Sequence, residues 1–417
     1  MTMKLRIPNV HIIDPKSMFH GQTMDILVED GVITAIAEDL SGSADETWDI
    51  AEGRCISPGW VDIRSYCGAP GHEERETYQS LAKAACHGGF TQVALMPNTS
   101  PARDSRPHIE ALESVAVDAP LAFLGIGAVT QGCQGEKLSE IMDMQQAGAV
   151  SFSDGGKGMN NPHLLQLALE YSDDLDVAIQ SHALDMEMCP IGSAHEGEAA
   201  VQSGLSPIPS IAETLRIQRD LSIHAYAGGR LHIAGVSTAE GVEMIRQAKA
   251  QGQIVTADVP VANLVGVDRD ITSFDTAYKV LPPLRSAADQ EALWQGLLDG
   301  TLDMIAMNHQ PMDVEHTDCE WGLAKFGAAT LDHAFGWYHE QNNSSEALSR
   351  WVEAVCHAPR ELYSIGDCSI AVGAPADLTV FALDGSDNQW ETLGVNRPSW
   401  PQNGRAIATM LGNKRSA

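Results

Sequence analysis

Basic side chains are scarce in this sequence. Its 417 residues include 26 Lys and Arg against 56 Asp and Glu, which gives a formal net charge of −30. A field of this sign repels nucleic acid and anionic membrane surfaces, so neither is expected as a partner. The acidic residues are spread along the chain and not gathered in a tail, which indicates a solvated acidic surface.

Long hydrophobic runs and paired cysteines are also lacking. No apolar run reaches the roughly 18 to 20 residues that a membrane span requires. The eight cysteines show no C-x-x-C spacing, which argues against a zinc ribbon or a disulfide framework and favours reduced thiols. The N-terminal residues lack the apolar core of a signal peptide. We therefore expect a globular cytoplasmic protein.

Short β-rich runs alternate with helical patterns from residue 59 onward. The expected strands are 59–66, 91–97, 121–129, 149–154, 177–183, 230–237, 254–261 and 303–308. Eight units of strand and helix predict an α/β fold of the closed (β/α)8 barrel type, over residues 59–365. An open doubly wound sheet is the main alternative, but no Gly-rich phosphate turn follows the first strand.

The two ends of the chain have a different pattern. Residues 1–58 and 366–417 contain alternating β segments such as MDILVEDGVITAIAEDL, TWDIAEGRCISPG and SIGDCSIAVGAPADLTVFALD. Each end alone would expose a hydrophobic face. We therefore predict that both ends together build one small β-sandwich beside the barrel.

Function in a barrel is expected at the carboxyl ends of its strands. In the first strand, alternation places Asp62, Arg64 and Tyr66 on one face. The polar or glycine residues that end or follow the other strands are Asn98, Asp154, Gly155, His182, Gly235, Asp258, Asn308 and His309.

Several segments together resemble one known family. Residues 58–101, PGWVDIRSYCGAPGHEERETYQSLAKAACHGGFTQVALMPNTSP, look like the first two barrel units of bacterial dihydroorotases in the amidohydrolase superfamily. The likeness continues in SFSDGG, HIAGVSTAEGV, TADVP, KVLPPLRSAADQEALWQGLLDGTLDMIAMNHQP and VGAPADLTVF, so it covers nearly the whole chain. The resemblance implies an amidohydrolase barrel that uses zinc to hydrolyse the cyclic amide of dihydroorotate.

The zinc ligands that the resemblance implies are largely missing. A His-X-His pair is expected at the end of strand one, where this chain has Arg64 and Tyr66. The second Asp of the strand-four pair is Gly155, next to Asp154. The strand-six His is Gly235 and the strand-eight Asp is Asn308, so His182 alone remains among the expected ligands. Because arginine cannot ligate a metal and one imidazole does not make a zinc site, we expect no cofactor.

The substrate clamp implied by the resemblance is altered as well. The family's Arg after the His-X-His pair is Gly68, and the Asn before Pro-Pro-Leu-Arg is Leu281. The paired His residues after strand seven are Ala262-Asn263, and a further His is Met312. Asn98 is retained. A carboxylate substrate would therefore lose a cationic partner at a defined place.

Several polar residues allow a structural and a functional interpretation. We expect His232 to face the helices, His309 to be structural, and Lys157 to be a solvated loop residue and not a carbamylated metal ligand. Arg64 needs a carboxylate neighbour if it is buried. We expect Asp154 or Asp62 to balance its charge, and Asp258 can also pair with it.

Two functions of different classes follow. The leading expectation is a catalytically inactive protein that supports the aspartate transcarbamoylase catalytic chain, as a homo-oligomer within a pyrimidine-pathway assembly. The alternative is an active cyclic amidohydrolase with a rebuilt site drawn from Asp154, His182, Asp258 and His309. A ligand-binding sensor that keeps the pocket without turnover is a third possibility.

Overall fold

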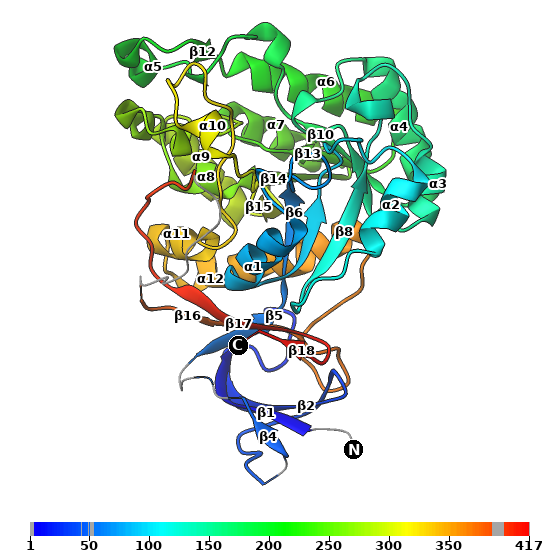
Figure 1. Cartoon of the computed structure of the whole chain (residues 1–417), viewed down its shortest axis with the longest axis vertical. Coiled ribbons are helices and arrows are strands. Elements are labelled where there is room, and N and C mark those ends of the chain that lie inside the picture. The colour runs from blue at the N-terminus through cyan, green and yellow to red at the C-terminus, as the bar shows by residue number, and fades with distance from the viewer. Residues whose placement is uncertain (1–3, 43, 49, 51–53, 386–395, 417) are drawn as a thin grey trace.

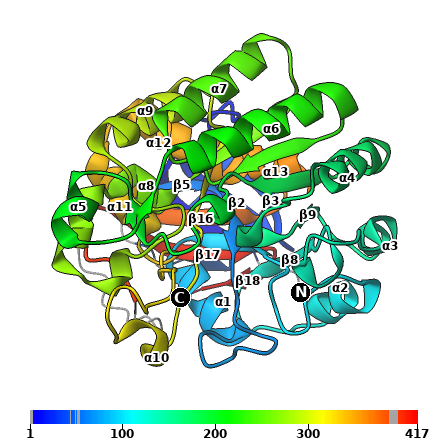
Figure 2. The same cartoon turned by 90° about the horizontal axis from the view of Figure 1, so that it is seen from above.

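Eight parallel strands form a barrel that is surrounded by helices (Figures 1 and 2). The computed structural model describes residues 4–42, 44–48, 50, 54–385 and 396–416. The barrel strands are β6 (Trp60–Ser65), β7 (Phe90–Leu95), β8 (Ala122–Gly127), β9 (Ser151–Ser153), β10 (Ala178–His182), β13 (Leu231–Ala234), β14 (Val255–Pro260) and β15 (Met304–Ala306). Each lies within a predicted run or within one residue of it, so the predicted barrel class is confirmed.

The barrel closes between its first and last strands. The spatial order runs from β6 through β7, β8, β9, β10, β13 and β14 to β15, with every neighbouring pair parallel. Beyond the end of β15, Ser65 and His309 form a parallel bridge. The Tyr66 N–H donates to the His309 carbonyl at 2.8 Å. These bonds hold the carboxyl ends of β6 and β15 together at the mouth of the barrel.

Helices cover the outside of the barrel. In α7, the N-cap residue Thr238 accepts a hydrogen bond from the Gly241 N–H at 3.1 Å. The described α-helices are α1 (Tyr78–His87), α2 (Arg106–Glu113), α3 (Ile141–Gln146), α4 (Pro162–Leu175), α5 (Glu198–Ser203), α6 (Ile211–Ala227), α7 (Ala239–Ala250), α8 (Val261–Val265), α9 (Ala287–Leu298), α10 (Val314–Thr317), α11 (Ala334–Gln341), α12 (Ser345–Val352) and α13 (Ala358–Tyr363). Short helical turns occupy Gln131–Cys133, Gly155–Lys157, Met186–Met188, Asp268–Ser273, Thr276–Tyr278 and, as a π-helical turn, Glu353–His357. None of the helices in the described ranges is long and apolar enough to cross a membrane.

Strands from both ends of the chain share a second sheet (Figure 1). Its members are β1 (Lys4–Ile12), β2 (Thr23–Glu29), β3 (Val32–Ala37), β4 (Glu46–Thr47), β5 (Cys55–Pro58), β16 (Asp377–Ala382), β17 (Arg405–Leu411) and β18 (Lys414–Arg415). The join lies between β5 and β16, which pair antiparallel with Cys55 opposite Phe381. Apolar residues of both halves, such as Ile7 and Val380, are buried in one core. Parts of the predicted end segments, at 1–3, 43, 49, 51–53, 386–395 and 417, lie outside the described residues, and the domain boundaries stay a prediction.

An aromatic cluster joins the sheet to the barrel. The Trp60 ring of β6 packs edge-on against Trp351 of α12 at 5.3 Å between ring centroids. Phe335 of α11 and Phe381 of β16 lie 5.2 and 5.6 Å from Trp60. Aromatic rings bury large areas and pack well in tilted geometries. The cluster therefore fixes the sheet against the end of the barrel that is opposite the mouth.

Candidate active site

A cavity of about 260 Å³ opens at the carboxyl ends of the barrel strands. Four of the predicted site residues line it, namely Tyr66, Gly68, Asn98 and His182. The loops add His72, Arg75, Lys157, Leu281 and Met312 to its wall. A larger cavity of about 570 Å³ lies between α1, β17 and β18. None of the predicted site residues lines that larger cavity, so the mouth cavity is the candidate active site.

Arg64 forms a buried network across the barrel interior. Its Nη1 donates to Asp258 Oδ2 at 3.0 Å and its Nη2 to Asp258 Oδ1. Its Nε donates to Asn308 Oδ1 at 3.1 Å, while the Asn308 side-chain amide donates to the Leu281 carbonyl. Both Arg64 and Asp258 are at most 2 % exposed. The guanidinium therefore stands where the resemblance placed a metal ligand, bound in bidentate fashion to a carboxylate.

Asp258 is the centre of this network. Besides Arg64, it accepts hydrogen bonds from His232 Nε2 at 2.8 Å and from the Gly235 N–H at 3.1 Å. Burial alone would raise the pKa of Asp258, but the Arg64 charge and the hydrogen bonds from His232 and Arg64 hold it below its ordinary value. The prediction that His232 faces the helices is wrong, because its ring reaches inward to Asp258. Gly235 lies beyond the end of β13 with φ +79°, so alternation counted back from Gly235 gives the wrong face for His232.

Asp154 does not balance Arg64, contrary to expectation. Its Oδ1 accepts from the Thr130 N–H at 2.9 Å and its Oδ2 from the Thr130 hydroxyl at 2.6 Å. Its backbone carbonyl accepts from Asn98 Nδ2 at 3.0 Å. Burial raises the pKa of Asp154, although the hydrogen bonds from Thr130 act to lower it. The carboxylate holds the loop after β8 instead of facing the guanidinium.

Two glycines stand on backbone that residues with a side chain rarely adopt. Gly155 has φ +65°, and a Cβ atom there would lie 1.9 Å from Asn98 Oδ1. Gly235 has φ +79°, and a Cβ atom there would lie 3.6 Å from the His182 ring. Both backbones are in the left-handed region that favours glycine. The Asp and His that the resemblance implies at these positions would therefore require a different local backbone.

His182 ends β10 and lines the cavity with its imidazole. The ring is buried, and its Nε2 has no hydrogen-bond partner among the described residues. Burial lowers the pKa of His182 to about 3, with help from the Arg64 and Arg216 charges. The imidazole is therefore neutral at physiological pH and presents an unsatisfied nitrogen.

Two cations and a phenol at the cavity were not predicted as functional groups. Arg75 follows strand β6 in the loop 67–77 and is half-buried, with an Nε that has no hydrogen-bond partner in the described chain. Lys157 is exposed on the loop after β9, as predicted, yet it also lines the cavity. Burial raises the pKa of Tyr66, which keeps its hydroxyl protonated as a donor. A single arginine in the acidic GHEERE segment is the one sequence signal that could have pointed to Arg75.

Gly68 explains why the expected clamp residue is missing. A Cβ atom at Gly68 would lie 2.0 Å from the His72 carbonyl oxygen. The His72 N–H donates to the Gly68 carbonyl at 2.8 Å, which closes this part of the loop tightly. No side chain fits at position 68 in this conformation. The cation supplied by this loop is Arg75 instead.

The residues at the mouth do not fit a zinc ion. His182 offers one neutral nitrogen, but Arg64 and Tyr66 replace the paired histidines, and the Asp258 carboxylate is held by Arg64. Among the described residues, the one group of three metal-binding side chains that lie close enough together is far from this cavity, at His357, Asp367 and Cys368. His309 is structural, as predicted, because its Nε2 lies 3.2 Å from Glu76 Oε1 and its Nδ1 accepts from the Thr330 N–H. A catalytic zinc needs about three protein ligands.

Known proteins resemble this chain over nearly its whole length. Residues 53–241 match the family described as Dihydro-orotase-like. The "Dihydroorotase" of Pelotomaculum thermopropionicum is 37 % identical over 92 % of this chain and 90 % of its own length. The "Dihydroorotase" of Syntrophus aciditrophicus is 36 % identical over 98 % of both chains.

A solved structure extends the likeness to the fold. The L-hydantoinase (dihydropyrimidinase) of Arthrobacter aurescens superposes with a TM-score of 0.86 at 25 % identity, over 100 % of this chain and 96 % of its own. Dihydroorotases and hydantoinases are enzymes. These names contradict the prediction that the chain is not an enzyme, which inferred inactivity from the lost zinc ligands alone. The chain belongs to the dihydroorotase-like family of the amidohydrolase superfamily.

Proposed function

We propose that the chain is a divergent cyclic amidohydrolase that opens the ring amide of a dihydroorotate-like substrate. One observation carries this proposal: in a chain of this family, the mouth cavity keeps the His182 imidazole, which is neutral and has a buried Nε2 without a hydrogen-bond partner among the described residues. Arg75 and Lys157 add positive charge to the wall of the same cavity. The proposal uses no metal at the mouth, since the residues there do not fit one.

The pocket can orient a carboxylate-bearing ring. A substrate carboxylate pairs with the Arg75 guanidinium or the Lys157 ammonium, which are the cations of the cavity wall. Asn98 Oδ1 has no hydrogen-bond partner in the described chain, so it can accept from a ring N–H. Fixing the ring at both ends brings the amide carbonyl toward His182.

His182 then moves the proton. A water molecule adds to the amide carbonyl carbon while His182 Nε2 accepts its proton, and the Tyr66 hydroxyl donates to the developing oxyanion. The C–N bond breaks, and the leaving nitrogen takes the proton back from His182. A base with a pKa of about 3 is weak, and a bound anion raises that value by stabilising the imidazolium. We therefore expect slow turnover compared with a metal-activated water.

Turnover by the metal-stripped, full-length protein tests this proposal. We expect ring opening of dihydroorotate above the buffer rate, and a loss of about 10²-fold or more in His182→Ala, because a positioned general base contributes that much. His163→Ala, an exposed histidine on α4, is the matched control and keeps full activity. Turnover equal to the buffer rate, with or without added zinc, would refute the enzyme assignment. Zinc-dependent turnover that His182→Ala leaves unchanged would refute the role of His182.

The family resemblance also supports a proposal about assembly. We propose that the chain works in the cytoplasm and associates with an aspartate transcarbamoylase catalytic chain as a homo-oligomer. Eight free cysteines are consistent with a reducing compartment. Size-exclusion chromatography of the two co-expressed proteins checks the association: a shared peak of higher mass is expected, and separate elution would exclude it.

A further inference from the structure

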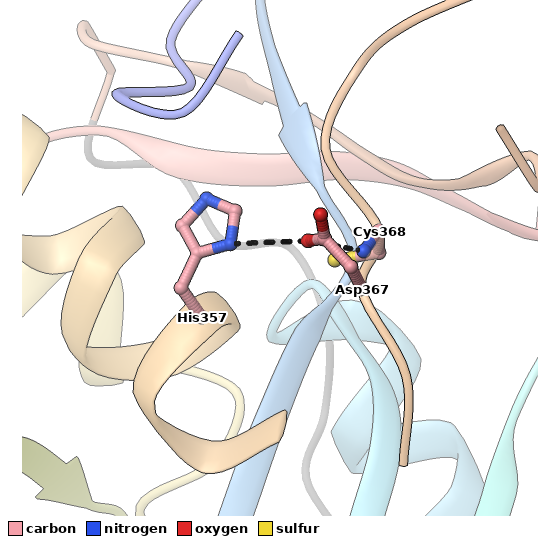
Figure 3. Close-up of side chains that lie close together, drawn as sticks. All are labelled: His357, Asp367 and Cys368. Carbon is pink, nitrogen blue, oxygen red and sulfur yellow. Dashed lines mark hydrogen bonds and ion pairs between the residues drawn. The ribbon is translucent and has the colours of Figure 1, made fainter. Parts of the chain in front are cut away.

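Three metal-binding side chains lie together at the end of the barrel opposite the mouth (Figure 3). His357 ends the π-helical turn Glu353–His357, and Asp367 and Cys368 lie in the segment between α13 and β16. The preceding residue, Cys356, donates to the Pro58 carbonyl at 3.3 Å, which places the cluster near the start of β6. One ligand atom from each of the three side chains lies within 4.8 Å of the others.

The His357 ring is fixed in an orientation that suits a metal ligand. Its Nε2 lies 2.8 Å from Asp14 Oδ1, and Asp14 is itself buried and accepts from the Ile370 N–H at 2.7 Å. The carboxylate therefore assigns the ring proton to Nε2 and leaves a lone pair on Nδ1. A histidine that donates its second nitrogen to a carboxylate is the usual arrangement around protein-bound metals.

The second ring nitrogen of His357, Nδ1, makes no hydrogen bond to the described residues. The His357 side chain is 1 % exposed, and this nitrogen is buried. It points toward Asp367, whose Oδ1 is 4.0 Å away (Figure 3). That distance is too long for a hydrogen bond. A buried acceptor without a partner is costly, so a ligand at this nitrogen would stabilise the fold.

The charges around the cluster favour a dication. Asp14, Asp367 and Asp377 supply three carboxylates, and Arg360, bound to Asp377, supplies the one buried cation among the described residues here. At the surface, Lys16 and Glu361 line the adjoining cavity of about 410 Å³. Their opposite charges cancel in the count. The formal excess of two negative charges, which becomes three when Cys368 ionises, favours a divalent cation.

We propose that His357 Nδ1, Cys368 Sγ and the Asp367 carboxylate bind one zinc-class divalent metal ion, with water from the adjoining cavity as fourth ligand. Sulfur and imidazole ligands select such ions over magnesium or calcium. Ligands at about 2.0 to 2.3 Å from a tetrahedral zinc are separated by about 3.3 to 3.7 Å, so Asp367 has to approach His357 only slightly. Cys368 binds as thiolate and releases its proton to solvent. The ion ties the segment before β16 to the π-helical turn and, through Asp14, to the terminal sheet.

Cobalt binding to the full-length protein tests this site. Titration of the metal-free protein with Co²⁺ is expected to produce a near-ultraviolet thiolate-to-cobalt band and visible bands of a tetrahedral ion, saturating at one equivalent. Cys368→Ser is expected to abolish the near-ultraviolet band. Asp367→Asn, an exposed position that does not threaten folding, is expected to weaken cobalt binding at least tenfold.

Two matched variants separate this site from other thiols and from the mouth. Cys319→Ser removes a partly exposed thiol outside the cluster, and His182→Ala removes the imidazole of the mouth. Neither is expected to change the spectrum or the stoichiometry. The proposal is overturned if the wild-type protein shows no thiolate band, if the band persists in Cys368→Ser, or if Asp367→Asn binds cobalt as tightly as the wild type.

Discussion

Arg64 depends on its carboxylate partner because its charge is buried in the barrel interior. The same carboxylate also accepts from His232 and from the Gly235 backbone, so one side chain accepts four hydrogen bonds from three residues. Removing one member of a buried ion pair leaves the other charge without solvent or partner. The network thus replaces the mutual support that a shared metal ion would give its ligands.

The first prediction concerns the stability of this pair. Asp258→Asn is expected to lower the free energy of unfolding by about 3 to 5 kcal/mol, because it leaves the Arg64 charge uncompensated. Urea denaturation measures the change. Asp176→Asn breaks the exposed Asp176–Arg230 pair and is the control, with an expected loss below about 1 kcal/mol. Equal effects of the two substitutions would contradict the assignment.

The second prediction concerns pH and His182. The folded-state pKa of about 3 lies below the unfolded value, so the unfolded chain binds one more proton between about pH 3 and 6.5. Stability therefore falls as the pH decreases through this window, with a slope of up to about 1.4 kcal/mol per pH unit from this group. His182→Gln removes that contribution. Urea midpoints between pH 7 and 5 should fall less steeply in the variant; parallel curves would show that His182 is not buried in neutral form.

At the scale of elements, the loop 67–77 brings a cation to the mouth because it folds tightly upon itself. Gly68 permits the close approach of the His72 carbonyl, and this turn precedes Arg75 by a few residues. A wider turn would move the guanidinium away from the cavity wall. The loop conformation and the position of the cation are therefore coupled.

The third prediction follows from that coupling. Gly68→Ala is expected to raise KM for dihydroorotate at least several-fold with a smaller effect on kcat, because it displaces Arg75 and leaves His182 in place. Gly42→Ala is the matched control, since a Cβ atom there would meet nothing within 4 Å. A variant with unchanged KM would contradict the coupling between this turn and substrate binding.

The strands were predictable from the sequence, whereas the partners inside the barrel were predictable only in part. Apolar runs with turn signals located all eight strands because each buries its side chains on both faces. Asp258 was one of the acids predicted as a partner of Arg64, and the structure selects it over Asp154. The face of His232 was predicted wrongly because Gly235, from which alternation was counted, lies outside β13. Arg75 and the cluster around His357 depend on loops and on segments far apart in sequence. Local periodicity does not show which loops and distant segments come into contact.

At the scale of the whole molecule, the barrel is inserted between two halves of one sheet. β5 is the strand that leads into the barrel, and β16 is the strand that leaves it and pairs with β5. Three apolar residues of β16 are fully buried: Leu378 and Val380 in the core of the sheet and Phe381 in the aromatic cluster. The barrel and the terminal sheet therefore depend on each other for their stability.

The fourth prediction tests this dependence. A chain that ends at residue 375 is expected to be recovered mainly in the insoluble fraction, because it exposes the edge of β5 and the apolar face of the sheet. A chain that ends at Asn413 loses only the short strand β18 and is the control, which should remain folded by circular dichroism. A well-folded barrel from the shorter chain would contradict the shared stability.

The pairing of β5 with β16 has a consequence for synthesis on the ribosome. The first strands of the sheet emerge at the start of translation, but their partner follows more than 300 residues later. At about 5 to 20 residues per second, this interval lasts at least about 15 seconds. During that time the nascent chain carries an open strand edge and an uncovered apolar face, which makes it a substrate for ribosome-associated chaperones.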